Sequence, residues 1–119
     1  MTALRVLVVE DHAMIAMFLA ETLAAMGYDV CAIETTEAGA VTAAVQHRPD
    51  LMIVDARLGN GSGVSAVEEI LRTEFVPHLF MSGNISEVKA LRPEAVVLAK
   101  PFCKAELTRA IQLVLDGPK

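Results

Sequence analysis

The chain has 119 residues, a net charge of −5 and 54% hydrophobic residues. This length fits one compact domain, predicted to occupy residues 1–119, and the apolar composition excludes a disordered chain and allows a core without metal or disulfide links. The acidic charge argues against a domain that binds nucleic acid through a basic face.

The first half of the chain alternates apolar runs with helical patterns. Residues 4–9 form a Val-rich run, typical of a strand covered on both faces. Residues 13–26 have helical spacing, and one face carries the following set: Ile15, Leu19, Thr22 and Met26. The methionines of this helix are interpreted as packing residues. A weaker strand over 30–33, an Ala-rich helix over 37–46 and a third strand over 51–54 follow.

The second half continues the alternation. Residues 57–62 form a Gly-rich loop, expected to be flexible, and Ser62 is predicted to cap the helix that follows. The remaining elements are expected, in chain order, as helix 64–73, strand 78–81, helix 85–91, strand 95–99 and helix 104–115. The segment between the last two strands is short, which predicts an abbreviated or irregular fourth helix.

Strands that alternate with helices predict a parallel sheet covered by helices on both faces. We therefore expect an α/β, flavodoxin-like three-layer sandwich with five strands in the order 2-1-3-4-5 and about five helices. In this strand order, a ligand crevice opens at the C-terminal ends of strands 1 and 3. The residues that follow the strands are therefore the candidates for function.

Polar residues follow four of these strands: Glu10 and Asp11 after the first, Asp55 after the third, Ser82 after the fourth and Lys100 after the fifth. Neighbouring carboxylates repel one another, and Mg²⁺, which prefers oxygen ligands, relieves that repulsion. An aspartate can attack phosphorus to form an aspartyl-phosphate. A lysine and a hydroxyl can then stabilise the phosphoryl oxygens. The set therefore indicates phosphoryl transfer with Mg²⁺ as cofactor.

The chain resembles a known family in the positions of these polar residues. It also shares Gly63 before the third helix and Pro101 and Phe102 after the lysine. This family is the receiver domain of bacterial two-component response regulators, also called CheY-like, and the resemblance covers nearly the whole chain. It implies that Asp55 is the phosphoacceptor and that Lys100 contacts the phosphoryl group. It also implies a cis peptide bond between Lys100 and Pro101.

The resemblance further implies a metal site and a switch. The metal ligands would be Glu10, Asp11, Asp55 and the backbone carbonyl of Arg57. Ser82 and Val97 occupy the two switch positions of the family, although Val97 stands where many members have an aromatic residue. Gly59 also replaces a usual proline. The Ser82-Gly83 pair without that aromatic residue is similar to an atypical alphaproteobacterial subgroup, although Asn84 stands in place of its tyrosine.

The function implied is that of a switch in a phosphorelay. A histidine kinase or phosphotransfer protein would donate the phosphoryl group, and the domain would catalyse its own phosphorylation and dephosphorylation without being an enzyme otherwise. An unidentified output protein would respond. Direct binding to nucleic acid or membrane is not expected, and the chain is expected to be a monomer or a weak homodimer.

Two alternatives belong to other functional classes. One is an aspartyl-phosphate-forming phosphohydrolase similar to the haloacid dehalogenase family, which needs an aspartate where this chain has Arg57. The other is an interaction module that does not depend on phosphorylation. The Arg57 side chain has three readings: a partner for Glu10, a screen against attacking water, or an ordinary surface residue.

Taken singly, each candidate has an ordinary structural explanation. Acidic residues often end a strand in solvent, and an aspartate or a Ser-Gly pair often belongs to a turn. Cys31 and Cys103 lie far apart in the sequence and are predicted to be free, mostly buried thiols of a reducing compartment. Acidic residues interrupt the first apolar run, and no apolar stretch is long enough to span a membrane, so a cytoplasmic protein is expected.

Overall fold

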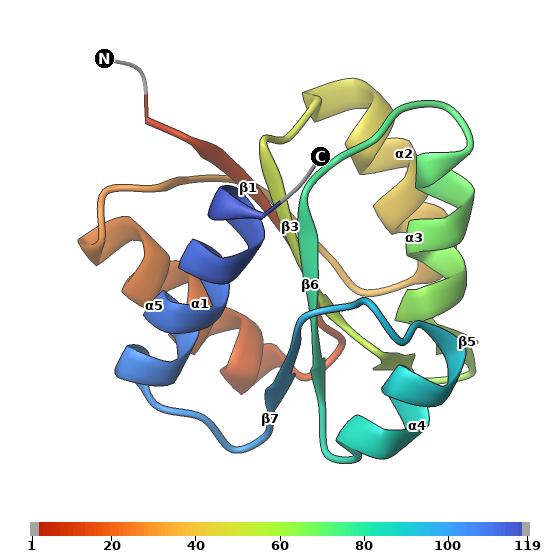
Figure 1. The fold of residues 1–119 in the computed structure, drawn as a ribbon. Helices are drawn as coiled ribbons and strands as arrows, with labels where there is room; N and C mark the ends of the chain where they lie inside the picture. Colours follow the sequence, from red (N-terminus) through yellow and green to blue (C-terminus); the bar gives the residue numbers. More distant parts are fainter. Residues whose placement is uncertain (1–2, 118–119) are drawn as a thin grey trace.

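The structure, a computed structural model, describes residues 3–117, so residues 1–2 and 118–119 of the predicted domain lie outside the described residues. A five-stranded parallel sheet forms the centre (Figure 1). In spatial order its strands are β2 (Asp29–Glu34), β1 (Arg5–Val9), β3 (Leu51–Asp55), β6 (His78–Ser82) and β7 (Val97–Ala99). The predicted flavodoxin-like strand order is confirmed.

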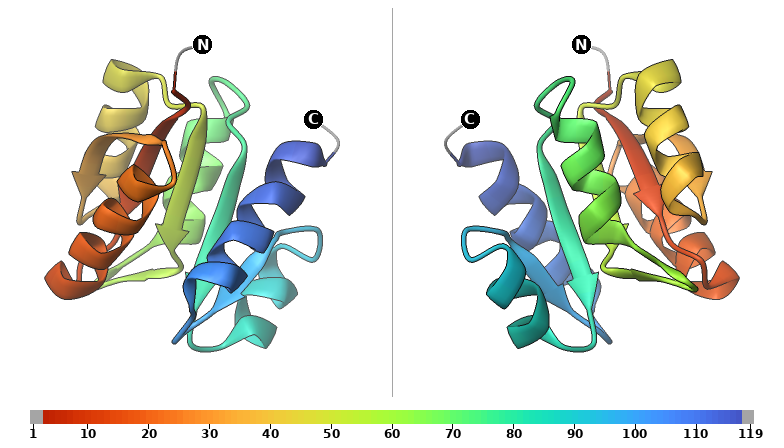
Figure 2. Two further views of the ribbon diagram at one scale, coloured as in Figure 1. Left: turned by 90° about the vertical axis from the view of Figure 1, so that its left-hand side faces the viewer. Right: turned by 90° about the vertical axis from the view of Figure 1, so that its right-hand side faces the viewer.

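Within residues 3–117, five helices form the two outer layers of the sandwich. They are α1 (Ala13–Ala25), α2 (Glu37–His47), α3 (Gly63–Leu71), α4 (Ile85–Leu91) and α5 (Lys104–Asp116). Figure 2 shows α1 and α5 on one face of the sheet and the other three helices on the opposite face. The fourth helix has 7 residues, against 9 to 13 in the others, so the predicted short fourth helix is confirmed.

The continuous apolar runs are explained by burial on both faces of the sheet. In β1, Val6 and Val8 pack beneath α1 and α5, whereas Leu7 and Val9 pack on the other side. Strand β3 alternates in the same way. Because successive strand residues point to opposite faces, a strand buried on both sides has no polar positions until its end. The first polar residues therefore appear together at the C-terminal edge of the sheet.

The inner face of α1 differs in part from the sequence prediction. The helix buries Ala16, Leu19 and Leu23, which share one helical face. Met14 and Met17 are 76% and 61% exposed, so their assignment as packing residues is wrong. Periodicity identifies a helix, but an Ala-rich helix such as α1 has more than one apolar face.

The Gly-rich loop after β3 forms a small hairpin, which the sequence did not predict. Strand β4 (Arg57–Leu58) pairs antiparallel with β5 (Gly61–Ser62). Gly59 has φ 54°, a left-handed conformation that glycine adopts without strain, and the Leu58 side chain is buried. The Ser62 backbone N–H donates to the Glu37 carboxylate at the start of α2. The Ser62 hydroxyl accepts from the Ser65 N–H, which confirms the predicted cap of α3.

Both cysteines are free, as predicted, but they are not mostly buried. Cys31 is partly buried and Cys103 is exposed. Burial raises the pKa of the Cys31 thiol, which favours its protonated form. Within residues 3–117, none of the helices combines the length and the apolar character needed to cross a membrane.

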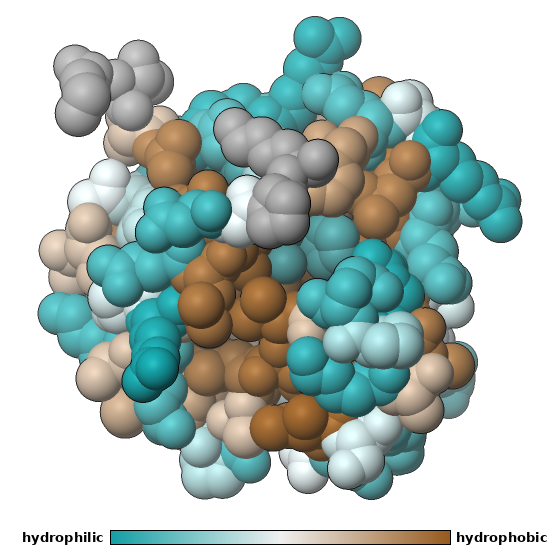
Figure 3. Space-filling model, in the orientation of Figure 1, coloured by the Kyte–Doolittle hydropathy of each residue, from teal (hydrophilic) through white to brown (hydrophobic). Residues whose placement is uncertain are grey.

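Apolar side chains gather on the surface between α5 and α4 (Figure 3). Leu91, at the end of α4, is 63% exposed, and Leu113 of α5 is 57% exposed. Val97 lies on the edge strand between these helices, where it pairs with Phe80 and packs, partly buried, against the core beneath α4. An exposed apolar face of this kind is typical of surfaces that bind other proteins.

Candidate functional site

The register of the sheet brings the predicted acidic residues together. Val9 of β1 pairs with Val54 of β3, so the residues that follow each strand lie at the same edge. Carboxylate oxygens of Glu10, Asp11 and Asp55, one from each residue, lie within 4.8 Å of one another. Glu10 and Asp55 are buried, whereas Asp11 is exposed. The cluster is therefore open to solvent on one side and supported by the core on the other.

Lys100 lies between the two buried carboxylates. Its Nζ donates to Glu10 Oε1 at 2.8 Å and to Asp55 Oδ2 at 2.9 Å. The Lys100 backbone N–H donates to the Ser82 carbonyl at 2.9 Å, and the peptide bond to Pro101 is cis. The end of β7 thereby holds the ammonium group at the same edge as the carboxylates.

The electrostatics of the cluster follow from burial and from these contacts. Burial raises the pKa of Glu10 above its ordinary value, and the bonds from Lys100 and from the His12 N–H counter this effect only in part. Burial opposes the charged form of Lys100 as well. The hydrogen bonds and charges of Glu10 and Asp55 outweigh that effect and raise the pKa of Lys100. The lysine therefore stays an ammonium ion at neutral pH.

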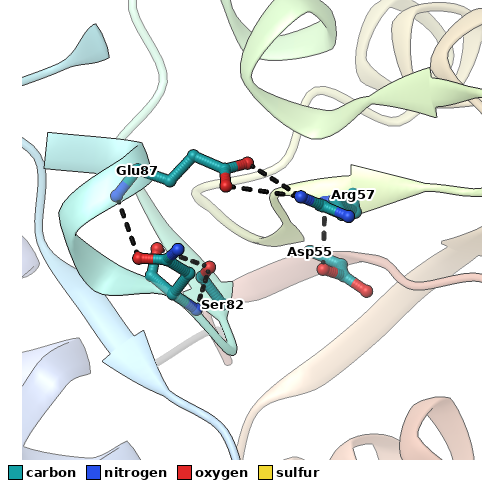
Figure 4. Close-up of polar contacts among 5 residues, drawn as sticks. Asp55, Arg57, Ser82 and Glu87 are labelled. Atoms are coloured by element: carbon teal, nitrogen blue, oxygen red, sulfur yellow. Dashed lines mark hydrogen bonds and ion pairs between the residues drawn. The ribbon is translucent and has the colours of Figure 1, made fainter. Parts of the chain in front are cut away.

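The backbone after Asp55 completes the surroundings of its carboxylate. The Arg57 N–H donates to Asp55 Oδ1 at 3.1 Å (Figure 4). Lys100 binds the other Asp55 oxygen. Gly63 donates its N–H to the Ala56 carbonyl and lies directly against Asp55, where an added Cβ would come within 1.9 Å of the Asp55 carbonyl oxygen. This close approach explains a glycine at position 63.

Ser82 lines a hollow beside the carboxylate cluster, and the other residues around this hollow are Asp55, Arg57, Gly83, Asn84 and Lys100. Its hydroxyl donates to the Asn84 carbonyl at 3.0 Å and accepts from the Asn84 N–H at 2.9 Å. Asn84 in turn caps α4 by accepting from the Glu87 N–H at 3.2 Å. The hydroxyl therefore belongs to the turn that starts α4 and lies beside the carboxylate cluster.

The Arg57 side chain has a partner that the sequence did not indicate. Its Nη2 lies 3.2 Å and 3.3 Å from the two carboxylate oxygens of Glu87 (Figure 4). The suggested pairing of Arg57 with Glu10 is wrong, because Lys100 and the His12 N–H occupy the Glu10 carboxylate. The Asn84-x-x-Glu87 spacing fits a helix start, but it gives no indication of a partner 30 residues away.

Comparison with known proteins gives consistent matches over nearly the whole chain. A family model described as the response regulator receiver domain matches residues 6–112. The phyllosphere-induced regulator PhyR of Methylorubrum extorquens is 34% identical over 117 residues, which are 95% of this chain and 44% of that protein. The transcriptional regulatory protein PdtaR of Mycobacterium tuberculosis is 33% identical over 116 residues, which are 94% of this chain and 57% of that protein.

A solved structure agrees. The receiver domain of PhyR from Erythrobacter litoralis superposes with a TM-score of 0.88 at 29% identity, covering 98% of this chain and 95% of that one. The chain spans about half the length of the two curated relatives. The matched family model, the strand order and the acidic cluster at the sheet edge agree with one another. The chain therefore belongs to the response regulator receiver domain family.

Proposed function

We propose that residues 1–119 form one receiver domain that accepts a phosphoryl group on Asp55 from a histidine kinase or a phosphotransfer protein. The observation that carries this proposal is the Lys100 ammonium group, 2.9 Å from Asp55 Oδ2 beside two further carboxylates. A positively charged donor next to a carboxylate is the arrangement that stabilises charge on an incoming phosphoryl group. Of the three carboxylates, Asp55 is the one that lines the hollow together with Ser82 and Lys100, which makes it the best-placed nucleophile.

The proposed transfer needs no reactant other than the Asp55 carboxylate and the phosphohistidine of the donor. An Asp55 carboxylate oxygen forms a bond to phosphorus, and the N–P bond of the donor phosphohistidine breaks with its electron pair left on the imidazole nitrogen. Lys100 counters the charge of the phosphoryl oxygens. Ser82 lines the same hollow, and its hydroxyl would donate to one of those oxygens. Hydrolysis of the acyl phosphate later restores the carboxylate, so the chain catalyses only its own phosphorylation cycle.

Magnesium is the proposed cofactor. The three clustered carboxylates offer only oxygen donors and lie close enough together to share one cation, which suits the hard Mg²⁺ ion. Glu10, Asp11 and Asp55 would hold it, with the backbone carbonyl of Arg57 as a further ligand. When bound, the ion would supply positive charge that neutralises the phosphoryl oxygens.

Substitution of Asp55 by Asn tests the phosphoacceptor. The amide cannot form an acyl phosphate, so the variant should take up no phosphoryl group above background from acetyl phosphate with Mg²⁺, while the wild-type chain takes up one per molecule. Intact-mass spectrometry measures the added phosphoryl group. Asp116→Asn, at an exposed position near the end of α5, is the matched control and should label like the wild type. Equal labelling of the Asp55 variant would reject the assignment.

An exposed apolar surface beside the site is the proposed docking face for the donor. It is formed by Met14, Met17 and Phe18 of α1 together with Phe102, whose ring lies 6.1 Å from that of Phe18. Part of it adjoins Lys100 in a groove along α1. Since the donor histidine has to reach Asp55, an apolar helix that carries it would contact this face.

The double substitution Met14→Gln and Met17→Gln tests the docking face. Phosphotransfer should slow about 5- to 10-fold with a histidine kinase chosen for its activity on the wild-type chain, because apolar contacts to the donor are lost. Phosphorylation by acetyl phosphate, which needs no docking, should not change. Val45→Gln, at an exposed position on α2 across the sheet, is the control. A double variant that receives phosphoryl groups from the kinase at the wild-type rate would exclude this face.

A further inference from the structure

The Arg57 side chain connects the segment after Asp55 with α4. Its guanidinium binds both carboxylate oxygens of Glu87, and its own backbone N–H donates to Asp55 Oδ1 (Figure 4). Arg57 also lines the hollow beside Asp55. One residue therefore contacts both the proposed phosphoacceptor and the fourth helix.

A second set of bonds joins the site to the same end of α4. The Ser82 hydroxyl is bonded to Asn84, and Asn84 caps α4 at the Glu87 N–H. Both routes from α4 thus end at a residue that lines the hollow beside Asp55, one at Arg57 and the other at Ser82. An added phosphoryl group would attract these two side chains as well as Lys100.

Helix α4 is short, and its other polar anchor lies near its C-terminal end, where Lys89 Nζ donates to the Ala95 carbonyl at 2.6 Å. The helix has 7 residues and buries Val88, while Ile85 and Leu91 are 39% and 63% exposed. A helix of two turns is not stable in isolation, so its position depends on its tertiary contacts. The polar contacts at its first turn, to Arg57 and to Ser82, therefore help to set its position.

The Arg57–Glu87 ion pair is weak because both side chains are exposed to solvent. The Arg57 and Glu87 side chains are 80% and 51% exposed, and ion pairs in solvent contribute little. A phosphoryl group carries about two negative charges and three acceptor oxygens, and guanidinium groups bind such oxygens in a bidentate manner. The phosphoryl group would therefore compete successfully with Glu87 for Arg57.

We infer that the Arg57–Glu87 ion pair is a latch: it holds α4 against the site in the unphosphorylated chain, and a phosphoryl group on Asp55 opens it by taking the guanidinium. This inference rests on the proposed phosphorylation of Asp55. It gives the Arg57 side chain the role of positioning the phosphoryl group. Because Val97 stands where many receiver domains have an aromatic switch residue, the latch would supply another connection between the site and α4. Opening would alter the apolar face between α4 and α5 (Figure 3).

Glu87→Gln tests the latch, because the amide keeps the shape of the side chain and removes its charge. The Mg²⁺-dependent affinity for beryllofluoride, a phosphoryl mimic, should rise roughly two- to fivefold, since Arg57 no longer has to leave a carboxylate. In the absence of beryllofluoride and Mg²⁺, the backbone amides of α4 should exchange hydrogen faster than in the wild-type chain. Fluorescence titration and hydrogen-exchange mass spectrometry measure the two effects.

Three further variants separate the latch from a general effect of charge. Arg57→Gln should bind beryllofluoride more weakly than Glu87→Gln, and adding the Glu87 change to it should have no further effect. Glu69→Gln is the matched control, because Glu69 of α3 pairs with Arg72, the residue after that helix, with similar exposures of 53% and 77%. It should leave both readouts unchanged.

An unchanged affinity and unchanged α4 exchange in Glu87→Gln would overturn the latch, and so would a Glu87 effect that persists without Arg57. A wild-type chain that fails to bind beryllofluoride would instead reject the proposed phosphorylation of Asp55, and the latch with it. If the wild-type chain binds beryllofluoride and the Glu87→Gln variant does not differ from it, the latch alone is rejected.

Discussion

Replacement of Lys100 by Met is expected to slow phosphorylation by acetyl phosphate about 100- to 1,000-fold, with the fold retained. The Lys100 ammonium group donates to Glu10 and to Asp55 at 2.8 Å and 2.9 Å. Methionine keeps most of the side-chain volume but removes the charge that would stabilise the phosphoryl oxygens. The rate, followed by intact-mass spectrometry at saturating Mg²⁺, measures the loss.

The same substitution leaves two buried carboxylates without their shared cation. Like charges at close range raise the pKa of a carboxyl group, so the pKa of Glu10, already raised by burial, should rise further. Added Mg²⁺ should therefore stabilise the Lys100→Met variant against heat more than it stabilises the wild-type chain. Lys104→Met, an exposed lysine at the start of α5, is the control. A Lys100 variant that labels within about threefold of the wild-type rate would contradict the role proposed for this lysine.

Substitution of Gly63 by Ala should have the largest effect on stability. The added Cβ would lie 1.9 Å from the Asp55 carbonyl oxygen and 2.7 Å from Val54 Cγ1. The first contact is with backbone at the end of β3, which cannot rotate away, so the Asp55 segment has to shift. Overpacking of this kind costs about 1–3 kcal/mol of unfolding free energy, measurable by urea denaturation.

Gly83→Ala is the matched control for Gly63→Ala. Gly83 is also close to the site, but nothing lies within 4 Å of an added Cβ at this position. Its unfolding free energy should stay within about 0.5 kcal/mol of the wild type. Equal urea midpoints for the two alanine variants would show that the close approach of Gly63 to Asp55 has no energetic consequence.

Much of the fold and of the candidate site followed from the sequence because both depend on local patterns. A strand that is apolar at every position has to be buried on both faces, which requires a parallel sheet between two helix layers. In such a sheet the first polar residue after each strand reaches the same edge. Glu10, Asp11 and Asp55 could therefore be placed together before any coordinates were known, and the structure brings their oxygens within 4.8 Å of one another.

Other features were decided by the tertiary structure. Helical spacing does not indicate which of two apolar faces is covered, and Met14 and Met17 lie on the uncovered one. The Gly-rich loop became a hairpin because its backbone pairs with itself and with the Glu37 carboxylate of α2. Local sequence contains no information about such packing neighbours.

The sequence by itself therefore determined the strand order, the short fourth helix and the chemical identity of the groups at the sheet edge. Only the tertiary structure decided how these groups are paired: Lys100 bridges Glu10 and Asp55, and Arg57 binds Glu87 instead of Glu10. The physical reason is that an ion pair depends on the distance and competition between side chains far apart in the chain. Periodicity and composition describe only neighbours along it.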